Sequence, residues 1–185
     1  MEAAFHLTPN PLLILVDDDS GSVRFPPAKR YIADAVAQEL LRNKAAALIV
    51  PQETVDVLRQ VHSNFDRRGC REVGEMAGAE QVLWIQIQDF LADEEIASAS
   101  DAAYITVTVK VINVLEKQSR SRVRLWPIGS AGTPLSTTIS GAKTIELKTT
   151  DAICTQLAED ISVKVAKLFY AHRLGEFESK PGEEG

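Results

Sequence analysis

The sequence predicts an α/β domain of the α+β type, with a mixed sheet of about five strands and helices packed mainly on one face. Apolar and polar residues alternate along 103–111, as in a strand with one buried and one solvated face. Apolar residues recur every three or four positions between 153 and 168, as on the buried stripe of an amphipathic helix. These patterns follow one another in the order β-α-β-α-α-β-β-β-α along 185 residues, a length that fits one domain.

Five elements are predicted in the first half of the domain. An apolar run of strand length predicts a buried strand, and the prolines at 26–27 are tolerated in the first turn of the helix that follows. Gly78 is suited to closing the last helix, because glycine readily adopts the left-handed conformation found there. The predicted elements are a strand at 12–16, a helix at 26–43, a strand at 46–50, a helix at 51–61 and a short helix at 70–77.

The second half is predicted to hold the antiparallel part of the sheet. A long, half-polar strand that is followed by a short turn and another β-rich run is typical of an antiparallel pair. Thr149 or Thr150, with Asp151, supplies an N-cap for the last helix, which ends near Tyr170 or His172. The predicted order is strand 82–90, loop 91–102, strand 103–115, strand 122–126, loop or edge structure at 128–140, a short edge strand at 144–148 and the last helix.

Composition bounds the domain and its partners. We expect residues 1–11 to form an N-terminal tail, residues 12–172 the domain, and residues 173–185 a disordered acidic tail. The net charge of −6 disfavours nucleic acid as a partner, because it would repel a phosphate backbone. Cys70 and Cys154 have no second Cys or His at ligand spacing, so no zinc site is expected, and their redox state stays open.

The run Asp17-Asp18-Asp19, at the end of the first strand, is the candidate metal site. Mg²⁺ takes oxygen ligands, usually with a carboxylate from a second strand end, and the predicted second strand ends without an acid. A response-regulator receiver also needs helix–strand units where this sequence predicts a long antiparallel strand. We therefore expect an acidic turn that hydrogen-bonds its own backbone, and keep a divergent receiver-like or nucleotide- and Mg²⁺-handling domain as the alternative.

No residue pattern in the sequence names a reaction. The three histidines, at positions 6, 62 and 172, have no Ser, Cys or Asp partner at a recognisable motif spacing. The glycines at 129 and 132 lack the lysine that follows a phosphate-binding loop. We expect a protein without enzymatic activity and without a cofactor.

The polar face of the long strand, with the basic strand after it, is the candidate partner-binding surface. Aromatic side chains are enriched at interface hot spots, although on a sheet they also pack beneath helices. Basic side chains give a local positive patch in an acidic protein, although charges on a hairpin also protect a sheet from edge pairing. The candidate residues are Tyr104, Thr106, Thr108, Lys110, Arg122, Arg124 and Trp126.

Three stretches carry a family resemblance. They are Gly78-Ala79-Glu80 with the following Gln-Val-Leu-Trp-Ile-Gln-Ile run, the Thr-Val-Thr-Val-Lys-Val-Ile-Asn-Val run that begins at Thr106, and Arg-Leu-Trp126-Pro127. Over residues 12–172 the chain resembles periplasmic α/β domains of bacterial envelope proteins. The classes are curli-secretion-like lipoproteins, peptidoglycan-synthase activator lipoproteins, the amino-terminal domain of the Tol-Pal β-propeller protein and uncharacterised planctomycete-type lipoproteins.

The resemblance implies a non-enzymatic binding or scaffolding module of the bacterial cell envelope, which contacts an envelope protein through its sheet and loops. It implies a location in the periplasm or cell envelope, with a cytosolic subunit of a larger complex as the alternative. No basic region with a long apolar stretch precedes Leu12, so an intact signal peptide is not expected within this chain. Membrane attachment would then require a lipid anchor outside it. The partner's identity and the oligomeric state stay open.

Overall fold

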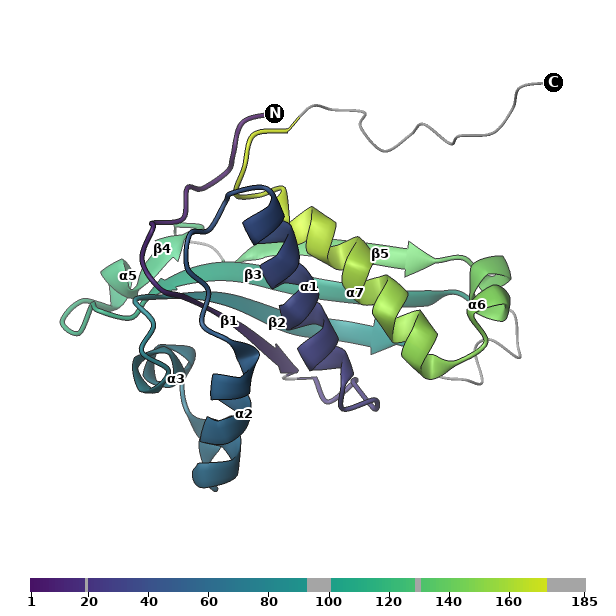
Figure 1. Cartoon of the computed structure of the whole chain (residues 1–185), viewed down its shortest axis with the longest axis horizontal. Coiled ribbons are helices and arrows are strands. Elements are labelled where there is room, and N and C mark those ends of the chain that lie inside the picture. The colour runs from purple at the N-terminus through teal and green to yellow at the C-terminus, as the bar shows by residue number, and fades with distance from the viewer. Residues whose placement is uncertain (19, 93–100, 129–130, 173–185) are drawn as a thin grey trace.

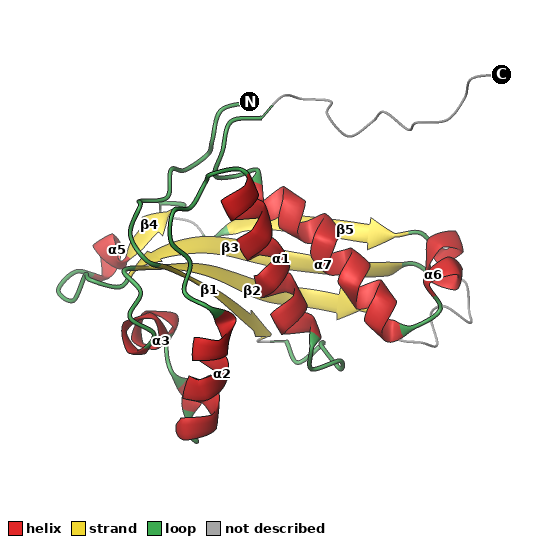
Figure 2. Ribbon diagram, viewed as in Figure 1, coloured by secondary structure: helices red, strands yellow, loops and turns green. Residues whose placement is uncertain are grey.

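The computed structural model describes residues 1–18, 20–92, 101–128 and 131–172. Two long helices lie side by side across one face of a five-stranded sheet, as Figures 1 and 2 show. The strands are β1 (Leu12–Asp18), β2 (Gln81–Leu91), β3 (Ala103–Asn113), β4 (Arg124–Trp126) and β5 (Thr133–Ile139). The helices are α1 (Ala28–Arg42), α2 (Gln52–Val61), α3 (Cys70–Met76), α5 (Arg120–Val123), α6 (Gly141–Leu147) and α7 (Thr150–Ala166), with the 3-10 turn η1 (Phe65–Arg67).

The predicted mixed sheet is confirmed. β1 pairs with β2 in parallel, and β2 pairs with the long strand β3 in antiparallel register. β3 pairs along its other edge with β5 and, near its end, with β4, both antiparallel. β3 is therefore the central strand, and its alternating pattern decides which residues face each side of the sheet.

The main core lies between the sheet and the two long helices. The odd-numbered residues of β3 from Ala103 to Val111 are fully buried beneath them. The α7 stripe includes Ile153, Leu157 and Ile161, each without measurable exposure, and Thr149 caps the helix by accepting the Ala152 N–H at 3.2 Å. The predicted last helix is confirmed, although it ends four residues before Tyr170.

A second, smaller core covers one end of the opposite face. Val55 of α2, Phe65 of η1 and Val73 of α3 pack against the side chains that β1, β2 and β3 direct to this side. Gly74 of α3 makes the close approach possible, since a Cβ there would lie 2.6 Å from a Val82 methyl and 2.7 Å from a Val114 methyl. The helices thus cover one face fully and the other at one end.

The strand predicted at 46–50 is reduced to one parallel bridge between Leu12 and Ile49. Two backbone hydrogen bonds secure it, from Leu12 N–H to Leu48 O and from Val50 N–H to Leu12 O, both 2.9 Å. Pro51 then opens α2, and the Gln52 side chain donates to Ile14 O at 2.8 Å where a further strand residue would have donated its N–H. The ladder stops because a proline and a helix start come immediately after the bridge.

Two predicted strands in the second half also differ. The segment predicted as an edge strand at 144–148 belongs to the helix α6, because Ser140 accepts the Lys143 N–H and the buried Thr144 hydroxyl donates to carbonyls at both Gly141 and Asp101. The strand predicted at 122–126 begins at Arg124, after the short helix α5. The edge strand β5 forms within the stretch predicted as loop or edge structure.

Of the eleven residues predicted as an N-terminal tail, residues 1–5 run beside the chain that follows α7, and Figure 1 shows these two ends together. The N–H groups of Ala4 and Phe5 donate to Leu168 O at 2.8 and 3.1 Å. The predicted tail at 173–185 and most of the predicted loop at 91–102 lie outside the described residues.

Candidate functional site

The face of the sheet opposite α1 and α7 carries a polar region that we call the open face. It consists of Tyr104, Thr106, Thr108 and Lys110 of β3 with the side chains beside them, namely Asp17 of β1, Trp84 and Gln86 of β2, and Ser136 and Thr138 of β5. The four β3 side chains are partly exposed, and those from β5 are exposed. Thr106 and Thr108 are therefore not buried beneath a helix. They remain candidates for contact with a partner, which burial would have excluded.

A network across three strands fixes the centre of the open face. The Trp84 Nε1–H donates to Asp17 Oδ2 at 2.7 Å. The Lys110 ammonium lies 4.7 Å from the centroid of the same indole ring and donates to Gln86 Oε1 at 2.6 Å. Because Gly132 has no side chain, the Lys110 stem has the space it occupies. Polar and aromatic groups are thus held in place before any partner arrives.

A second pair lies farther along the open face. The Tyr104 hydroxyl donates to Asp89 Oδ2 at 3.1 Å, just past the register shift in β2. This hydrogen bond, with smaller effects from burial and from the Asp89 charge, raises the pKa of Tyr104 above its ordinary value. The phenol therefore stays protonated at neutral pH and can act as a hydrogen-bond donor.

The three other predicted contact residues lie elsewhere. Arg122 extends from α5 and pairs with Glu116 at 3.4 Å, and Arg124 lies opposite Ile112 in β4. Trp126 belongs to the main core, with ring centroids 6.4 Å from Phe5 and 5.7 Å from Phe169. The Trp126 ring is engaged within the chain, so we leave it out of the open face.

The acidic residues at the end of β1 have local structural roles where they are described. Asp17 accepts the Trp84 hydrogen bond, and Asp18 accepts from Val23 N–H at 2.9 Å and from the Ser20 hydroxyl at 2.7 Å. Burial opposes ionisation of Asp18, but these bonds outweigh it and hold its pKa below the ordinary value. Asp19 lies outside the described residues, and no cluster of three or more potential metal ligands occurs among those described.

Neither Cys70 nor Cys154 forms a disulfide, and their thiols differ in exposure. Cys154 is buried in the main core, and Cys70 is half-buried at the start of α3. Burial is the largest influence on Cys70 and raises its pKa to about 11, so its thiol is protonated at neutral pH. A protonated thiol is a poor nucleophile and a poor metal ligand.

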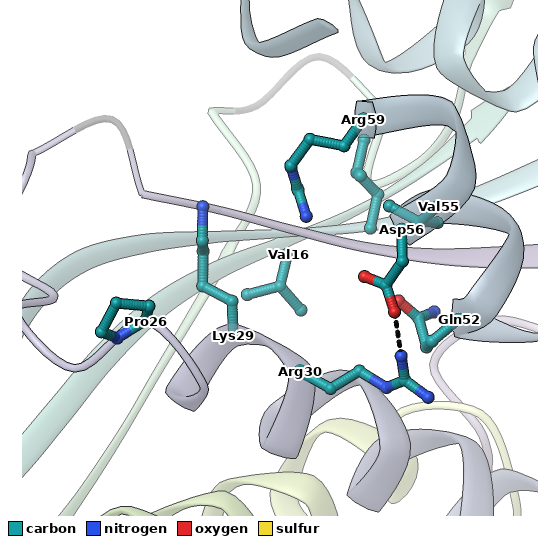
Figure 3. A pocket seen from close by; sticks show the side chains of 9 residues that line it. Val16, Pro26, Lys29, Arg30, Gln52, Val55, Asp56 and Arg59 are labelled. Carbon is teal, nitrogen blue, oxygen red and sulfur yellow. Dashed lines mark hydrogen bonds and ion pairs between the residues drawn. The ribbon is translucent and has the colours of Figure 1, made fainter. Parts of the chain in front are cut away.

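A small pocket of about 120 Å³ lies at the outer edge of β1, between α1 and α2 (Figure 3). We call it the β1 pocket. Its floor includes Val16 and Val55, and its other lining residues are Leu15, Pro26, Lys29, Arg30, Gln52, Asp56 and Arg59. No local sequence pattern predicted this pocket, although the first turn of α1 carries two basic residues and no acidic one.

No family model and no curated protein matches this chain. Among solved structures, a substituted PelC from Paraburkholderia phytofirmans, described as a dodecamer, is 13% identical, with a TM-score of 0.50 over 92% of this chain and 95% of that one. The hypothetical protein CT253 from Chlamydia trachomatis is 12% identical, with a TM-score of 0.48 over 86% and 97%. The lipoprotein GNA1162 from Neisseria meningitidis is 11% identical, with a TM-score of 0.40 over 71% and 81%.

None of the helices in the described ranges is long and apolar enough to cross a bilayer. The similarity to PelC extends over nearly the full length of both chains, and at 13% identity it concerns the fold. The chain therefore shares its α/β fold with PelC.

Proposed function

We propose that this chain is a non-enzymatic binding or scaffolding module of the bacterial cell envelope, and that the open face contacts its protein partner. The observation that carries the proposal is the network of Asp17, Trp84 and Lys110, which orders side chains on a part of the sheet that stays accessible. Ordered aromatic and charged groups lose little conformational entropy on binding, which favours their use at interfaces.

The edges of the sheet favour the same surface. On the β1 side, the bridge at Ile49 and the Gln52 side chain occupy the carbonyls of Leu12 and Ile14. On the β5 side, the Lys164 ammonium donates to Ser136 O at 2.6 Å, and Pro134 has no N–H to offer. These features are typical of edges that are protected against strand addition, so the partner is expected to contact the face.

The envelope location rests on the sequence resemblance of the three stretches that begin at Gly78, Thr106 and Arg124. We place the chain in the periplasm or on the envelope, with a cytosolic subunit as the alternative. The PelC neighbour is described as a dodecamer, so a second copy of this chain is the first partner to examine. Cell fractionation tests the location, and light scattering of the purified chain tests self-association.

Site-specific photo-crosslinking in the native host tests the contact surface. The photoreactive residue replaces Thr106 on the open face or, as the matched control, the exposed Thr155 on α7. We expect a discrete adduct from position 106 that the substitution Thr108→Arg abolishes, and no such adduct from position 155. Equal adducts from both positions, or none from 106, would contradict the use of the open face.

The nucleotide- and Mg²⁺-handling alternative is tested separately. A ligand that binds the native state raises the midpoint of thermal unfolding. Millimolar Mg²⁺ with nucleotides should produce no increase of this midpoint that depends on Asp17 or Asp18. A saturable increase that Asp17→Ala or Asp18→Ala removes would instead support the nucleotide- and Mg²⁺-handling alternative.

A further inference from the structure

The β1 pocket has a positive lining in an acidic protein. Among the described residues that line it, Lys29, Arg30 and Arg59 are basic and Asp56 is acidic, whereas the chain has a net charge of −6. The pocket lies at the outer edge of β1, between the first turn of α1 and one side of α2, and is separate from the open face.

Arg30 has a structural role in this pocket. Its guanidinium donates to Asp34 on its own helix at 2.7 Å and to Glu53 and Asp56 on α2. These partners, Asp34 foremost, raise its pKa above the ordinary value. Arg30 therefore ties α1 to α2, and its charge is balanced by these three carboxylates, so the positive charge available to a ligand comes from Lys29 and Arg59.

Lys29 and Arg59 keep their binding capacity. Within the described ranges, no carboxylate lies at ion-pair distance from the Lys29 ammonium. The Nε of Arg59 lies 3.5 Å from Asp66 Oδ1, and the guanidinium carbon lies 5.0 Å from the centroid of the Phe65 ring. A guanidinium that stacks on a ring still offers the N–H donors in its own plane to a ligand. Figure 3 shows Lys29 and Arg59 extending from α1 and α2 on either side of Val16.

We propose that the β1 pocket binds a phosphate group between Lys29 and Arg59. The volume of about 120 Å³ suits one small oxyanion, and the buried Val16 and Val55 close the floor. Guanidinium and ammonium groups are the usual protein ligands of phosphate, the first through paired N–H donors and the second as a point charge. The start of α1 adds to the favourable potential, because it carries no acidic side chain.

Titration of the full chain with inorganic phosphate, followed by amide chemical shifts in NMR, tests this proposal. Ionic strength is held constant with chloride, because exposed cations respond to salt in general. We expect saturable shifts at residues 28–30 and at the Gln52 side-chain amide. Lys29→Gln and Arg59→Gln should each weaken binding by about tenfold, the scale of one charged hydrogen bond. The matched control is Lys143→Gln on the distant α6, which should leave binding unchanged.

Each alternative outcome has a defined meaning. Shifts that chloride reproduces, or that both pocket variants retain, would overturn the proposal. Lys29 is partly exposed and has no ion-pair partner within the described ranges, so Lys29→Gln is expected to keep the wild-type unfolding midpoint. A loss of phosphate binding in this variant can then be attributed to the missing ammonium. Parallel titrations with glycerol phosphate and acetate identify the kind of ligand that supplies the phosphate group. Tighter binding of glycerol phosphate than of inorganic phosphate indicates a phosphorylated ligand, and equal affinities for the two indicate the free ion. Tighter binding of acetate than of inorganic phosphate would overturn the assignment to phosphate.

Discussion

The hydrogen bond between Trp84 and Asp17 should make a measurable contribution to the stability of the open face. In the wild type the Lys110 ammonium lies 4.7 Å from the centroid of the Trp84 ring, and the Trp84 Nε1 lies 2.7 Å from Asp17 Oδ2. Trp84→Phe keeps an aromatic ring beneath Lys110 and removes this hydrogen-bond donor. Hydrogen bonds to charged groups contribute about 1.5–3 kcal/mol. Both residues are half-buried, so water can solvate the freed carboxylate, and we expect a contribution of about 1 kcal/mol.

A double-mutant cycle isolates this contribution from the smaller size of phenylalanine. Urea unfolding, followed by far-ultraviolet circular dichroism, gives the free energy of unfolding for the wild type, Trp84→Phe, Asp17→Ala and the double variant. The coupling between the two changes should be about 1 kcal/mol. The control cycle is Tyr31→Phe with Asp151→Ala, an exposed hydrogen bond of the same length, 2.7 Å, whose coupling should be smaller. A Trp84–Asp17 coupling indistinguishable from zero would refute the idea that this network orders the open face.

Three further predictions concern packing, the β5 edge and pH. Gly74→Ala should lower the free energy of unfolding by about 1–3 kcal/mol in urea titrations, because overlap with Val82 and Val114 outweighs the roughly 1 kcal/mol gain in helix propensity. An unchanged free energy of unfolding would contradict the close approach of α3 to the sheet. Lys164→Met should expose Ser136 O and promote concentration-dependent association in light scattering, whereas Lys143→Met should leave the chain unchanged. The pKa of Asp18 is lower in the folded state than in the unfolded chain, so its stabilising contribution is complete above the unfolded value of about 4 and is lost as pH falls through the folded value. The free energy of unfolding of Asp18→Asn should lack this loss at low pH. A pH profile identical to that of the wild type would contradict the prediction.

The spacing of apolar residues was sufficient to predict an element where all of its apolar positions lie on one buried face. The alternation in β3 and the apolar stripe of α7 were both predicted from sequence, and both elements form the main core. Periodicity failed in short segments. The apolar run at 46–50 satisfies a strand pattern, yet Pro51 and the start of α2 limit it to one bridge at Ile49. The segment 144–148 has strand-like residues, yet the Ser140 cap and the hydrogen bonds of Thr144 make it helical.

The open face was only partly accessible to sequence reasoning. Parity along β3 identified Tyr104, Thr106, Thr108 and Lys110 as one face. Their neighbours Asp17 and Trp84 lie 67 positions apart in the chain and meet only because β1 pairs in parallel with β2. The same limit applies to Trp126, whose contacts with Phe5 and Phe169 depend on how both ends of the domain pack.

The sequence by itself determined the α/β class, the central strand and the polar character of one of its faces, because these follow from spacing between near neighbours in the chain. Only the tertiary structure decided how the strands pair, which half of that face α2 and α3 cover, and that Lys29 and Arg59 line one pocket. Strand register and helix packing bring together residues that are distant in sequence, and no local pattern records those distances.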